Sequence, residues 1–183
     1  GLVRAGAEVV MATEPSDLLG VDSVVLPGVG ATKTVMDGID AAGFREPLRA
    51  LEVPLFGICV GMQALFDASE EDDAECLGLI PGLVRRLRNT PSLPHIGWND
   101  LRIERPDPLF DSVPDEPVYF VHSYAPEPAD ESTIVATSDH GERFVAAVRS
   151  GSVSGTQFHP ERSGRVGLAI LANVVAAAAR VNV

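Results

Sequence analysis

Hydrophobic residues recur along the chain with two spacings, one typical of strands and one typical of helices. Residues Ala7–Met11 alternate and are rich in valine, and Asp22–Leu26 repeats this pattern before it stops at Pro27-Gly28. Residues 32–51 carry apolar side chains at helical spacing, and the short apolar run Val53–Ile58 then indicates a buried strand. The first half of the chain therefore predicts strands and helices in alternation.

The second half of the chain favours β-structure. A helix is predicted at residues 61–66, but the periodic signal then fades, and residues 79–94 resemble a loop with a basic stretch. An alanine-rich stretch from Val166 to Val181 predicts a closing helix. Short runs of β-branched and aromatic residues predict later strands at 101–103, 118–122, 133–137, 144–149 and 153–158.

Composition narrows the fold class and excludes some partners. The 183 residues suffice for one core of ordinary size, so residues 1–183 are interpreted as a single domain. Aromatic residues make up only 5% of a chain that is 45% hydrophobic, which favours an α/β protein whose mostly parallel sheet has an aliphatic core. The formal charge of −12 would repel phosphate backbones and anionic lipids, which argues against nucleic-acid and membrane binding.

The acidic residues and the cysteines indicate which parts of the chain are exposed and in which cellular setting it works. Acidic residues are densest at Glu70–Asp73, which we interpret as a solvated loop after a helix, with an acidic docking patch as the alternative. Cys59 and Cys76 are too few for a disulfide framework and lack the spacing of a metal site, so a reducing cytosol is the simplest setting. No apolar run is long enough to span a bilayer.

The segment Gly57-Ile58-Cys59-Val60-Gly61 has the layout of a nucleophile elbow. A buried strand leads through G-x-C-x-G into a helix, and a side chain on such a sharp turn projects above the sheet. Glycines are needed on either side because the backbone and the helix approach too closely for a Cβ atom. The helix N-terminus favours a thiolate, so we interpret Cys59 as a nucleophile rather than a buried small hydrophobe, and Cys76 as structural.

A cysteine nucleophile usually needs an imidazole base, and the chain contains His95, His122, His140 and His159. His159 follows a predicted strand, and Glu161 two residues later is placed to orient its ring. His140 lies in a segment that indicates an exposed turn, whereas His122 fits a core position and a pocket lining equally well. We therefore expect Cys59, His159 and Glu161 to form a catalytic triad.

Three segments together resemble the signature blocks of the class I glutamine amidotransferases. They are Pro27-Gly28-Val29-Gly30, Gly57–Gln63 and Gly155–Glu161, in the family's order and spacing across nearly the whole chain. The resemblance implies a doubly wound, flavodoxin-like fold with additional antiparallel strands in the second half. It also implies a thioester mechanism that needs no metal or other cofactor: Cys59 attacks the side-chain amide of glutamine, His159 protonates the departing ammonia, and water releases glutamate.

The resemblance implies further roles around the triad. The oxyanion would be held by the backbone N–H of Val60 and by one from Val29 or Gly30. Bound glutamine would be contacted by Gly28, Gly61, Gln63, Ser123 and Tyr124. Taken alone, the Pro27–Gly30 segment would be interpreted only as a turn that ends a strand.

Within that family, Pro94–Asn99 and Tyr119–Tyr124 are most similar to the glutaminase subunits of imidazole glycerol phosphate synthase. In that heterodimeric enzyme, ammonia passes through a tunnel to a (β/α)8 cyclase subunit, where it enters histidine biosynthesis. The resemblance puts Trp98, Asn99 and Tyr119 near the subunit interface. For Trp98 a packed core position is the alternative, which we rate lower because its neighbours indicate a loop.

Two alternative functions remain open: the glutaminase of a different synthase, serving GMP, anthranilate or carbamoyl phosphate synthesis, or a non-catalytic docking subunit with the same fold. The family also opens with a strand and most of a helix for which this chain has no counterpart, and Leu2–Gly6 resembles the last turn of a helix. We therefore expect an N-terminally shortened chain, in which Ala7–Met11 lies apart from the main sheet or pairs with Val24–Leu26.

Overall fold

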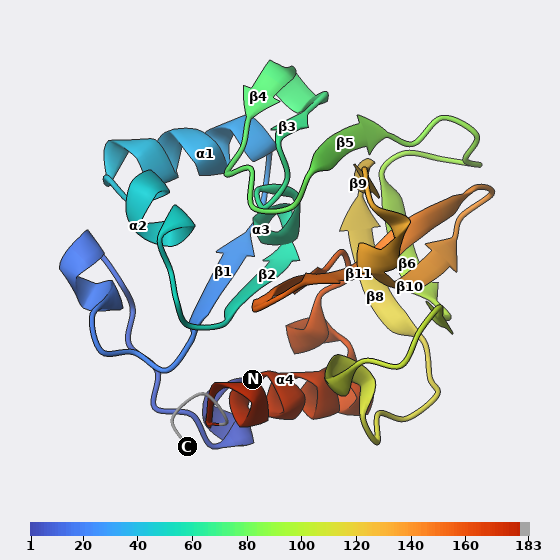
Figure 1. The fold of residues 1–183 in the computed structure, drawn as a ribbon. Coiled ribbons are helices and arrows are strands. Elements are labelled where there is room, and N and C mark those ends of the chain that lie inside the picture. Colours follow the sequence, from blue (N-terminus) through green and yellow to red (C-terminus); the bar gives the residue numbers. More distant parts are fainter. Residues whose placement is uncertain (180–183) are drawn as a thin grey trace.

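The computed structural model describes residues 1–179, in which helices cover both faces of a central sheet (Figure 1). The α-helices are α1 (Thr32–Ala41), α2 (Arg45–Arg49), α3 (Val60–Gln63) and α4 (Gly164–Ala179). The strands are β1 (Val24–Gly28), β2 (Leu55–Cys59), β3 (Ala68–Ser69), β4 (Ala74–Glu75), β5 (Gly82–Arg86), β6 (His95–Asn99), β7 (Arg102–Ile103), β8 (Val118–His122), β9 (Tyr124–Pro128), β10 (Ile134–Asp139), β11 (Arg143–Ser150) and β12 (Val153–Thr156). Short 3₁₀ helices occupy Val3–Ala5 (η1), Pro15–Leu18 (η2), Glu71–Asp73 (η3), Pro108–Phe110 (η4), Glu131–Thr133 (η5) and Pro160–Arg162 (η6).

The central sheet has six strands in the order β1-β2-β12-β11-β10-β7. Strands β1, β2 and β12 run parallel, whereas β11, β10 and β7 are added through antiparallel pairings. The expected α/β class is confirmed, with the antiparallel strands coming from the second half of the chain. Among the described residues β1 pairs with β2 alone, so β1 forms one edge of this sheet.

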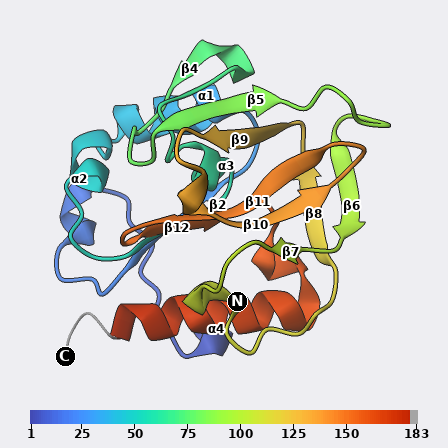
Figure 2. The same ribbon diagram turned by 45° about the vertical axis from the view of Figure 1, so that its right-hand side comes forward.

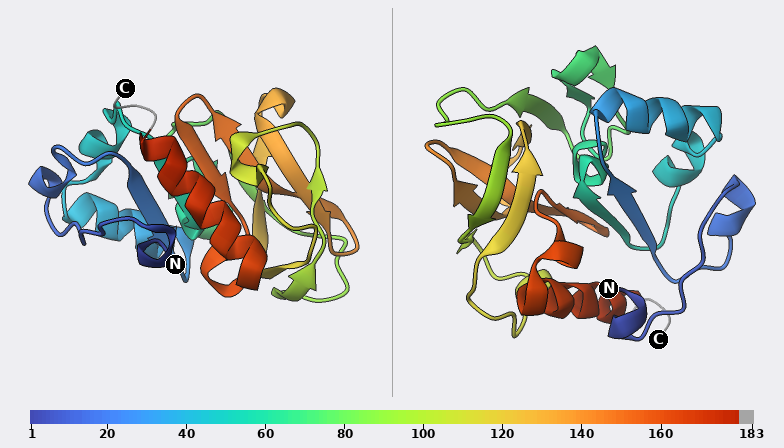
Figure 3. Two further views of the ribbon diagram at one scale, coloured as in Figure 1. Left: turned by 90° about the horizontal axis from the view of Figure 1, so that it is seen from below. Right: turned by 180° about the vertical axis from the view of Figure 1, so that it is seen from behind.

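Successive side chains of β2 point to opposite faces of the sheet and enter two separate cores. Phe56 and Ile58 belong to the core that includes Ile170 of α4. Leu55 belongs to the other core, together with Met36 of α1. Figures 1 and 3 show the same arrangement, with α4 against one face of the sheet and α1 and α2 on the opposite side. The helices therefore hold the parallel strands rigidly from both sides.

A second β-region lies beside the antiparallel half of the central sheet (Figure 2). Strands β4, β3, β5 and β9 form a four-stranded sheet in that order, and β6 pairs with β8 in a two-stranded sheet. Strands β8 and β9 follow each other directly at Ser123. The turn between them joins these two smaller sheets and, as described below, reaches the end of β2.

The structure corrects the expectation for the start of the chain. The strand expected at Ala7–Met11 is absent. The segment lies apart from the sheet, which was one of the two expected arrangements, and Val10 and Met11 are exposed. A strand needs a partner for its backbone hydrogen bonds, and the described residues offer this segment none. Leu2–Gly6 contains a helical turn, the 3₁₀ helix η1, as expected.

The other differences fall where Gly, Pro or charged residues obscure the hydrophobic pattern. The helix expected over residues 32–51 is divided into α1 and α2, and β5 lies in a segment that had been interpreted as a loop. Strand β9 contains Pro126 and Pro128, which it tolerates because it is an edge strand that, within residues 1–179, pairs only with β5. The closing helix begins at Gly164, and its expected end beyond Ala179 lies outside the described residues.

The remaining predicted strands agree with the observed strands to within two residues at either end, and the helix expected at residues 61–66 is the shorter α3. Of the helices described between residues 1 and 179, none is long and apolar enough to cross a membrane.

Candidate active site

Three parallel strands end side by side at one edge of the central sheet. Gly28 at the end of β1 is in register with Cys59 at the end of β2, and Thr156 at the end of β12 is in register with Ile58. His159 follows the end of β12 by three residues. Ligands of open α/β sheets bind beyond the carboxyl ends of the strands, and the expected nucleophile and base both lie there.

Cys59 occupies a strained turn between β2 and α3. Its φ of 54° and ψ of −114° lie outside the regions that residues with a side chain favour. The turn also requires close approach of backbones. A Cβ atom added at Gly61 would clash with the carbonyl oxygen of Leu26, and one added at Gly28 would lie 2.5 Å from the backbone nitrogen of Gly61. This is the close approach expected of a nucleophile elbow.

The thiol of Cys59 is buried among polar groups. The Nε2 of Gln157 donates to its Sγ atom at 3.6 Å, and Sγ lies 3.9 Å from the carbonyl oxygen of Val121. The Gln157 side chain is itself fixed, because Nε2 of Gln63 donates to its Oε1 at 3.0 Å and to the carbonyl oxygen of Tyr124 at 2.9 Å. These contacts hold the sulfur between β8 and the segment that follows β12.

The ring of His159 lies between Glu161 and Cys59. Its Nδ1 is 2.7 Å from Oε1 of Glu161, while its buried Nε2 makes no hydrogen bond with the residues described. Burial lowers the pKa of His159, but Cys59 and Glu161 outweigh this effect and raise the pKa to about 9. Burial raises the pKa of Glu161, but the hydrogen bond from His159 outweighs it, so this pKa is lowered. The arrangement favours an imidazolium paired with a carboxylate.

The backbone around His159 is tied to β8. The N–H of His159 donates to the carbonyl oxygen of Tyr119 at 2.9 Å. The hydroxyl of Ser163 donates to the carbonyl oxygen of His159 at 2.7 Å and accepts from the N–H of Tyr119 at 3.0 Å. Any displacement of β8 would therefore be passed directly to the imidazole.

The segment after β1 lies next to the elbow. Gly28 packs against the backbone of Val60 and Gly61. Val60 is buried at the start of α3, whereas Val29 has an exposed fraction of 77% and Gly30 adopts a φ of 88°. The structure thus brings together the two segments that carry the expected oxyanion donors.

Ser123 separates β8 from β9, and together with Tyr124, the first residue of β9, it makes up the turn after β8; both residues are half-buried. The Ser123 carbonyl oxygen accepts from the N–H of Leu87 at 3.0 Å, and the Tyr124 carbonyl oxygen accepts from Gln63. The expected glutamine-contacting residues Gln63, Ser123 and Tyr124 therefore share one hydrogen-bonded region, although 61 positions separate Gln63 from Tyr124.

Trp98, Asn99 and Tyr119, the expected interface residues, lie on the paired strands β6 and β8. Trp98 is opposite Tyr119, with ring centroids 5.8 Å apart, and its exposed fraction of 56% rules out a packed core position. The expected loop at Trp98 is wrong, because Trp98 belongs to β6. The Tyr119 ring lies 6.4 Å from the His159 ring and beneath the Arg162 guanidinium, so an exposed aromatic surface adjoins the expected base.

Three polar residues of the site had no role in the interpretation of the sequence. Gln157 lies within a signature block, yet its contact with the thiol follows only from the fold. Glu71 was assigned to a solvated loop, but its half-buried carboxylate accepts from the backbone N–H and the hydroxyl of Thr32 at 2.7 and 3.0 Å. The Thr32 hydroxyl also lies 3.1 Å from Oε1 of Gln63, so Glu71 and Thr32 extend the same network. The local signal that points to Thr32 is its place as the first residue of α1, after the N-cap Ala31.

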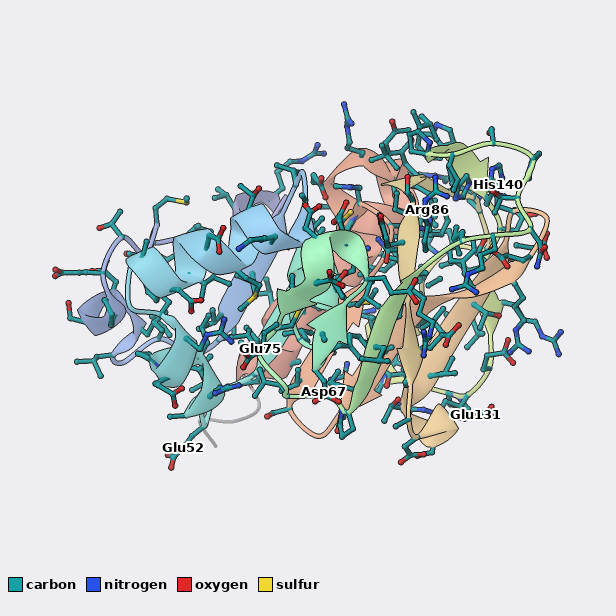
Figure 4. All side chains as sticks on the ribbon, turned by 90° about the horizontal axis from the view of Figure 1, so that it is seen from above. Glu52, Asp67, Glu75, Arg86, Glu131 and His140 are labelled. Carbon is teal, nitrogen blue, oxygen red and sulfur yellow. The ribbon has the colours of Figure 1, made fainter. Side chains whose placement is uncertain are left out.

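Among the described residues, neither the other histidines nor the second cysteine makes a hydrogen bond with the thiol of Cys59. His95 and His122 are buried and contact each other, and His140 occupies a turn, half-buried rather than exposed as expected. Glu52 and His140 mark opposite ends of the molecule in Figure 4. Burial raises the pKa of Cys76 to about 11, which suits a structural thiol. Over residues 1–179, His, Cys, Asp and Glu side chains form no group of three that could hold a metal ion.

An α/β sheet that carries a cysteine elbow and a His–Glu pair at the ends of its parallel strands is typical of enzymes that use a cysteine nucleophile. The model of the family "Glutamine amidotransferase class-I" matches residues 3–178, and the chain belongs to this family.

Curated relatives indicate which members of the family the chain resembles. A protein from Synechococcus sp. (strain JA-3-3Ab), "Imidazole glycerol phosphate synthase subunit HisH", is 50% identical over 98% of this chain and 87% of its own length. A protein of the same name from Natronomonas pharaonis is 46% identical over 96% of this chain and 86% of its own.

Solved structures with lower identity share the fold. A glutamine amidotransferase gives a TM-score of 0.67 at 20% identity, over 98% of this chain and 88% of that one. A glutamine amidotransferase from Thermotoga maritima gives 0.60 at 20% identity, over 97% of this chain and 70% of that one.

Proposed function

We propose that this chain is the glutaminase subunit of an imidazole glycerol phosphate synthase. It hydrolyses glutamine to glutamate and ammonia, and the ammonia passes to a cyclase subunit in histidine biosynthesis. The observation that carries the chemistry is the His159–Glu161 pair beside the buried Cys59 at the strand ends. The 50% identity to a protein named as a HisH subunit carries the choice of synthase.

Cys59 is the nucleophile in this proposal. Its proton passes to Nε2 of His159, and the sulfur attacks the amide carbon of glutamine. The charge that develops on the amide oxygen is stabilised by the backbone N–H of Val60 and by one from Val29 or Gly30. The packing of Gly28 against Val60 and Gly61 supports this assignment, because it places the two donor segments against each other beside the elbow.

His159 then returns its proton to the amide nitrogen, which leaves as ammonia and a thioester remains. The raised pKa of His159, about 9, supports this role, because the imidazolium that forms when the ring takes the thiol proton is stable at neutral pH until the leaving group needs that proton. Water attacks the thioester with His159 as the base, and the thiol and glutamate are released. Glu161 orients and stabilises the imidazolium without itself carrying the proton.

Glutamine binds between the elbow and the turn after β8. The residues proposed to contact it are Gly28, Gly61, Gln63, Ser123 and Tyr124. The hydrogen bonds that join Gln63 to the Tyr124 carbonyl, and through Gln157 to the sulfur, support this placement. They make the turn and the nucleophile parts of one rigid surface.

The partner is a (β/α)8 cyclase subunit in a heterodimer, with Trp98, Asn99 and Tyr119 at the interface. The exposed ring of Trp98, packed on Tyr119 close to His159, supports this surface. The setting we propose is the cytosol, where both thiols remain reduced.

The test is glutamate release by the chain alone, with the cyclase subunit, and with the cyclase subunit and its nucleotide ligand. We expect stimulation by the liganded cyclase and none by the synthase subunits for GMP, anthranilate or carbamoyl phosphate. Stimulation by one of those would reassign the partner. A folded complex that neither turns over glutamine nor reacts at Cys59 with a glutamine-mimicking electrophile would instead indicate a docking subunit.

A further inference from the structure

Two buried histidines that the proposed chemistry does not use form a line of contacts from β6 to the turn after β8. Nδ1 of His95 lies 3.1 Å from Nε2 of His122, and Nδ1 of His122 lies 2.8 Å from the carbonyl oxygen of Tyr124. At the other end, Nε2 of His95 lies 2.8 Å from Oδ1 of Asn99, whose Nδ2 donates to the Asp139 carbonyl oxygen at 2.8 Å. The His95–His122 pair thus joins Asn99 to Tyr124.

The line continues from Tyr124 to the nucleophile. The Tyr124 carbonyl oxygen also accepts from Nε2 of Gln63, the same atom donates to Oε1 of Gln157, and Nε2 of Gln157 donates to the sulfur of Cys59. Gln63 and Gln157 are both buried. An unbroken series of polar contacts therefore runs from Asn99 to the sulfur.

The His95–His122 pair has one proton fewer than its three contacts require. The Tyr124 carbonyl oxygen and Oδ1 of Asn99 are both acceptors, so each end of the pair must present an N–H. A third N–H is needed between the rings, whereas two neutral imidazoles supply only two. Burial lowers the pKa of His95 and lowers that of His122 to about 3, which favours neutral rings. One of the three contacts must therefore lack its proton. The position of that contact decides which nitrogen of each ring is the donor.

The missing proton is best tolerated at the Asn99 end. The Tyr124 contact is part-buried, and the His122 ring that makes it is packed against Phe144 and Phe120, with ring centroids 4.8 and 5.6 Å away. The Asn99 amide lies at the more exposed end, and a half-turn of this amide presents Nδ2 to His95. Both rings then carry the proton on Nδ1. The mismatch moves to the Asn99–Asp139 contact, where water or a partner chain supplies a donor.

We propose that His95 is a positioning residue for the glutaminase reaction, which keeps the proton of His122 on Nδ1 and thereby holds the Tyr124 carbonyl in place beside Gln63. This inference rests on the proposed function, because it assumes that the turn contacts glutamine. It makes Asn99, next to the exposed Trp98, the point at which contact with β6 affects the nucleophile's surroundings.

The first test is the ring protonation of His122, measured by ¹⁵N NMR on the full chain at neutral pH, with assignments from His95 and His122 variants. We expect the Nδ1–H form, which is the less common form of a free imidazole. Protonation on Nε2 alone, or on both nitrogens, would overturn the proposal. This measurement needs no enzymatic activity, so a failure here is distinguishable from a failure of the proposed function.

The second test uses glutamine kinetics in the complex with the liganded cyclase subunit. His95→Phe retains a stacking ring but loses both polar contacts, and we expect KM for glutamine to rise about tenfold with little change in kcat, as for one lost buried hydrogen bond. His95→Asn keeps a donor near the position of Nδ1 and should bring KM back to within about threefold. His140→Phe alters a histidine that stacks on the same ring outside the series, and KM should stay unchanged. Equal effects of all three variants would mean that the cluster acts only by packing.

Discussion

Replacing Glu161 by Gln tests the proposal that His159 transfers the proton and that Glu161 only orients and stabilises the imidazolium. In the wild type, Oε1 of Glu161 lies 2.7 Å from Nδ1 of His159 and helps to raise the pKa of His159 to about 9. The amide oxygen of Gln still accepts from Nδ1–H, so the ring keeps its orientation. The imidazolium loses its ion-pair partner, however, and we expect the pKa of His159 to fall toward its ordinary value of 6.5.

The size of the effect follows from the exposure of the carboxylate. A hydrogen bond to a charged group contributes about 1.5–3 kcal/mol. The Glu161 side chain has an exposed fraction of 46%, so solvent screens part of the interaction and the lower end applies. Because the amide of Gln keeps a hydrogen bond worth about 0.5–1.5 kcal/mol, the net loss is about 1 kcal/mol, which slows hydrolysis roughly fivefold. His159→Ala removes proton transfer altogether, which is worth about 10²–10⁴-fold, and must therefore cost more.

The pH dependence has a definite sign. A histidine with a raised pKa is protonated below that pKa, so protonation of the leaving group is retained at neutral pH and lost as the pH rises through about 9. In Glu161→Gln the same loss should occur at lower pH.

The assay is kcat/KM for glutamate release with the liganded cyclase subunit, measured across pH because kcat/KM reports the pKa values of the glutamine-free site, with the pKa of His159 followed by NMR. The matched control is Glu52→Gln, because Glu52 is an exposed carboxylate that precedes the start of β2, whereas Cys59 is at its end, and it should leave the profile unchanged. The reasoning is refuted if Glu161→Gln loses as much activity as His159→Ala, or if the alkaline limb stays where it is.

Three further predictions concern the elbow and the exposed aromatic surface. Cys59→Ala should abolish hydrolysis but leave the fold and cyclase binding intact, and an equal loss in Cys76→Ala would mean that the wrong cysteine was chosen. Gly61→Ala should lower the free energy of unfolding in urea by about 3 kcal/mol, since the added Cβ meets the β1 backbone. Gly38→Ala, in an open position of α1, should raise it by up to about 1 kcal/mol, so similar values for the two would contradict the packing argument. Trp98→Ala should weaken cyclase binding by about 2 kcal/mol in calorimetry without changing stability; a loss of stability instead would assign Trp98 to packing.

The candidate triad could be predicted from the sequence because its signals are local. The two glycines that permit the elbow lie within two residues of Cys59, and Glu161 lies two residues from His159. Their convergence needs little further information, since parallel strands of one sheet all end at the same edge. The surrounding network is different. Gln157 lies 98 positions from Cys59, and His95 lies 27 positions from His122, so nothing local distinguishes these side chains from ordinary core residues.

Strand β6 shows why such contacts escaped prediction. It alternates as a strand should, but inversely: His95 is buried, whereas the apolar Ile96 and Trp98 have exposed fractions of 61% and 56%. A pattern that expects apolar residues inside therefore fails at this strand. An inverted strand is stable only where its inward polar atoms are hydrogen-bonded, because an unpaired buried donor or acceptor costs about 1–3 kcal/mol. The contacts of His95 with His122 and Asn99 meet that condition. The outward apolar face needs a covering of its own, which the proposed cyclase contact would supply. The same inversion that hid the strand thus accounts for both the buried histidine pair and the exposed aromatic surface.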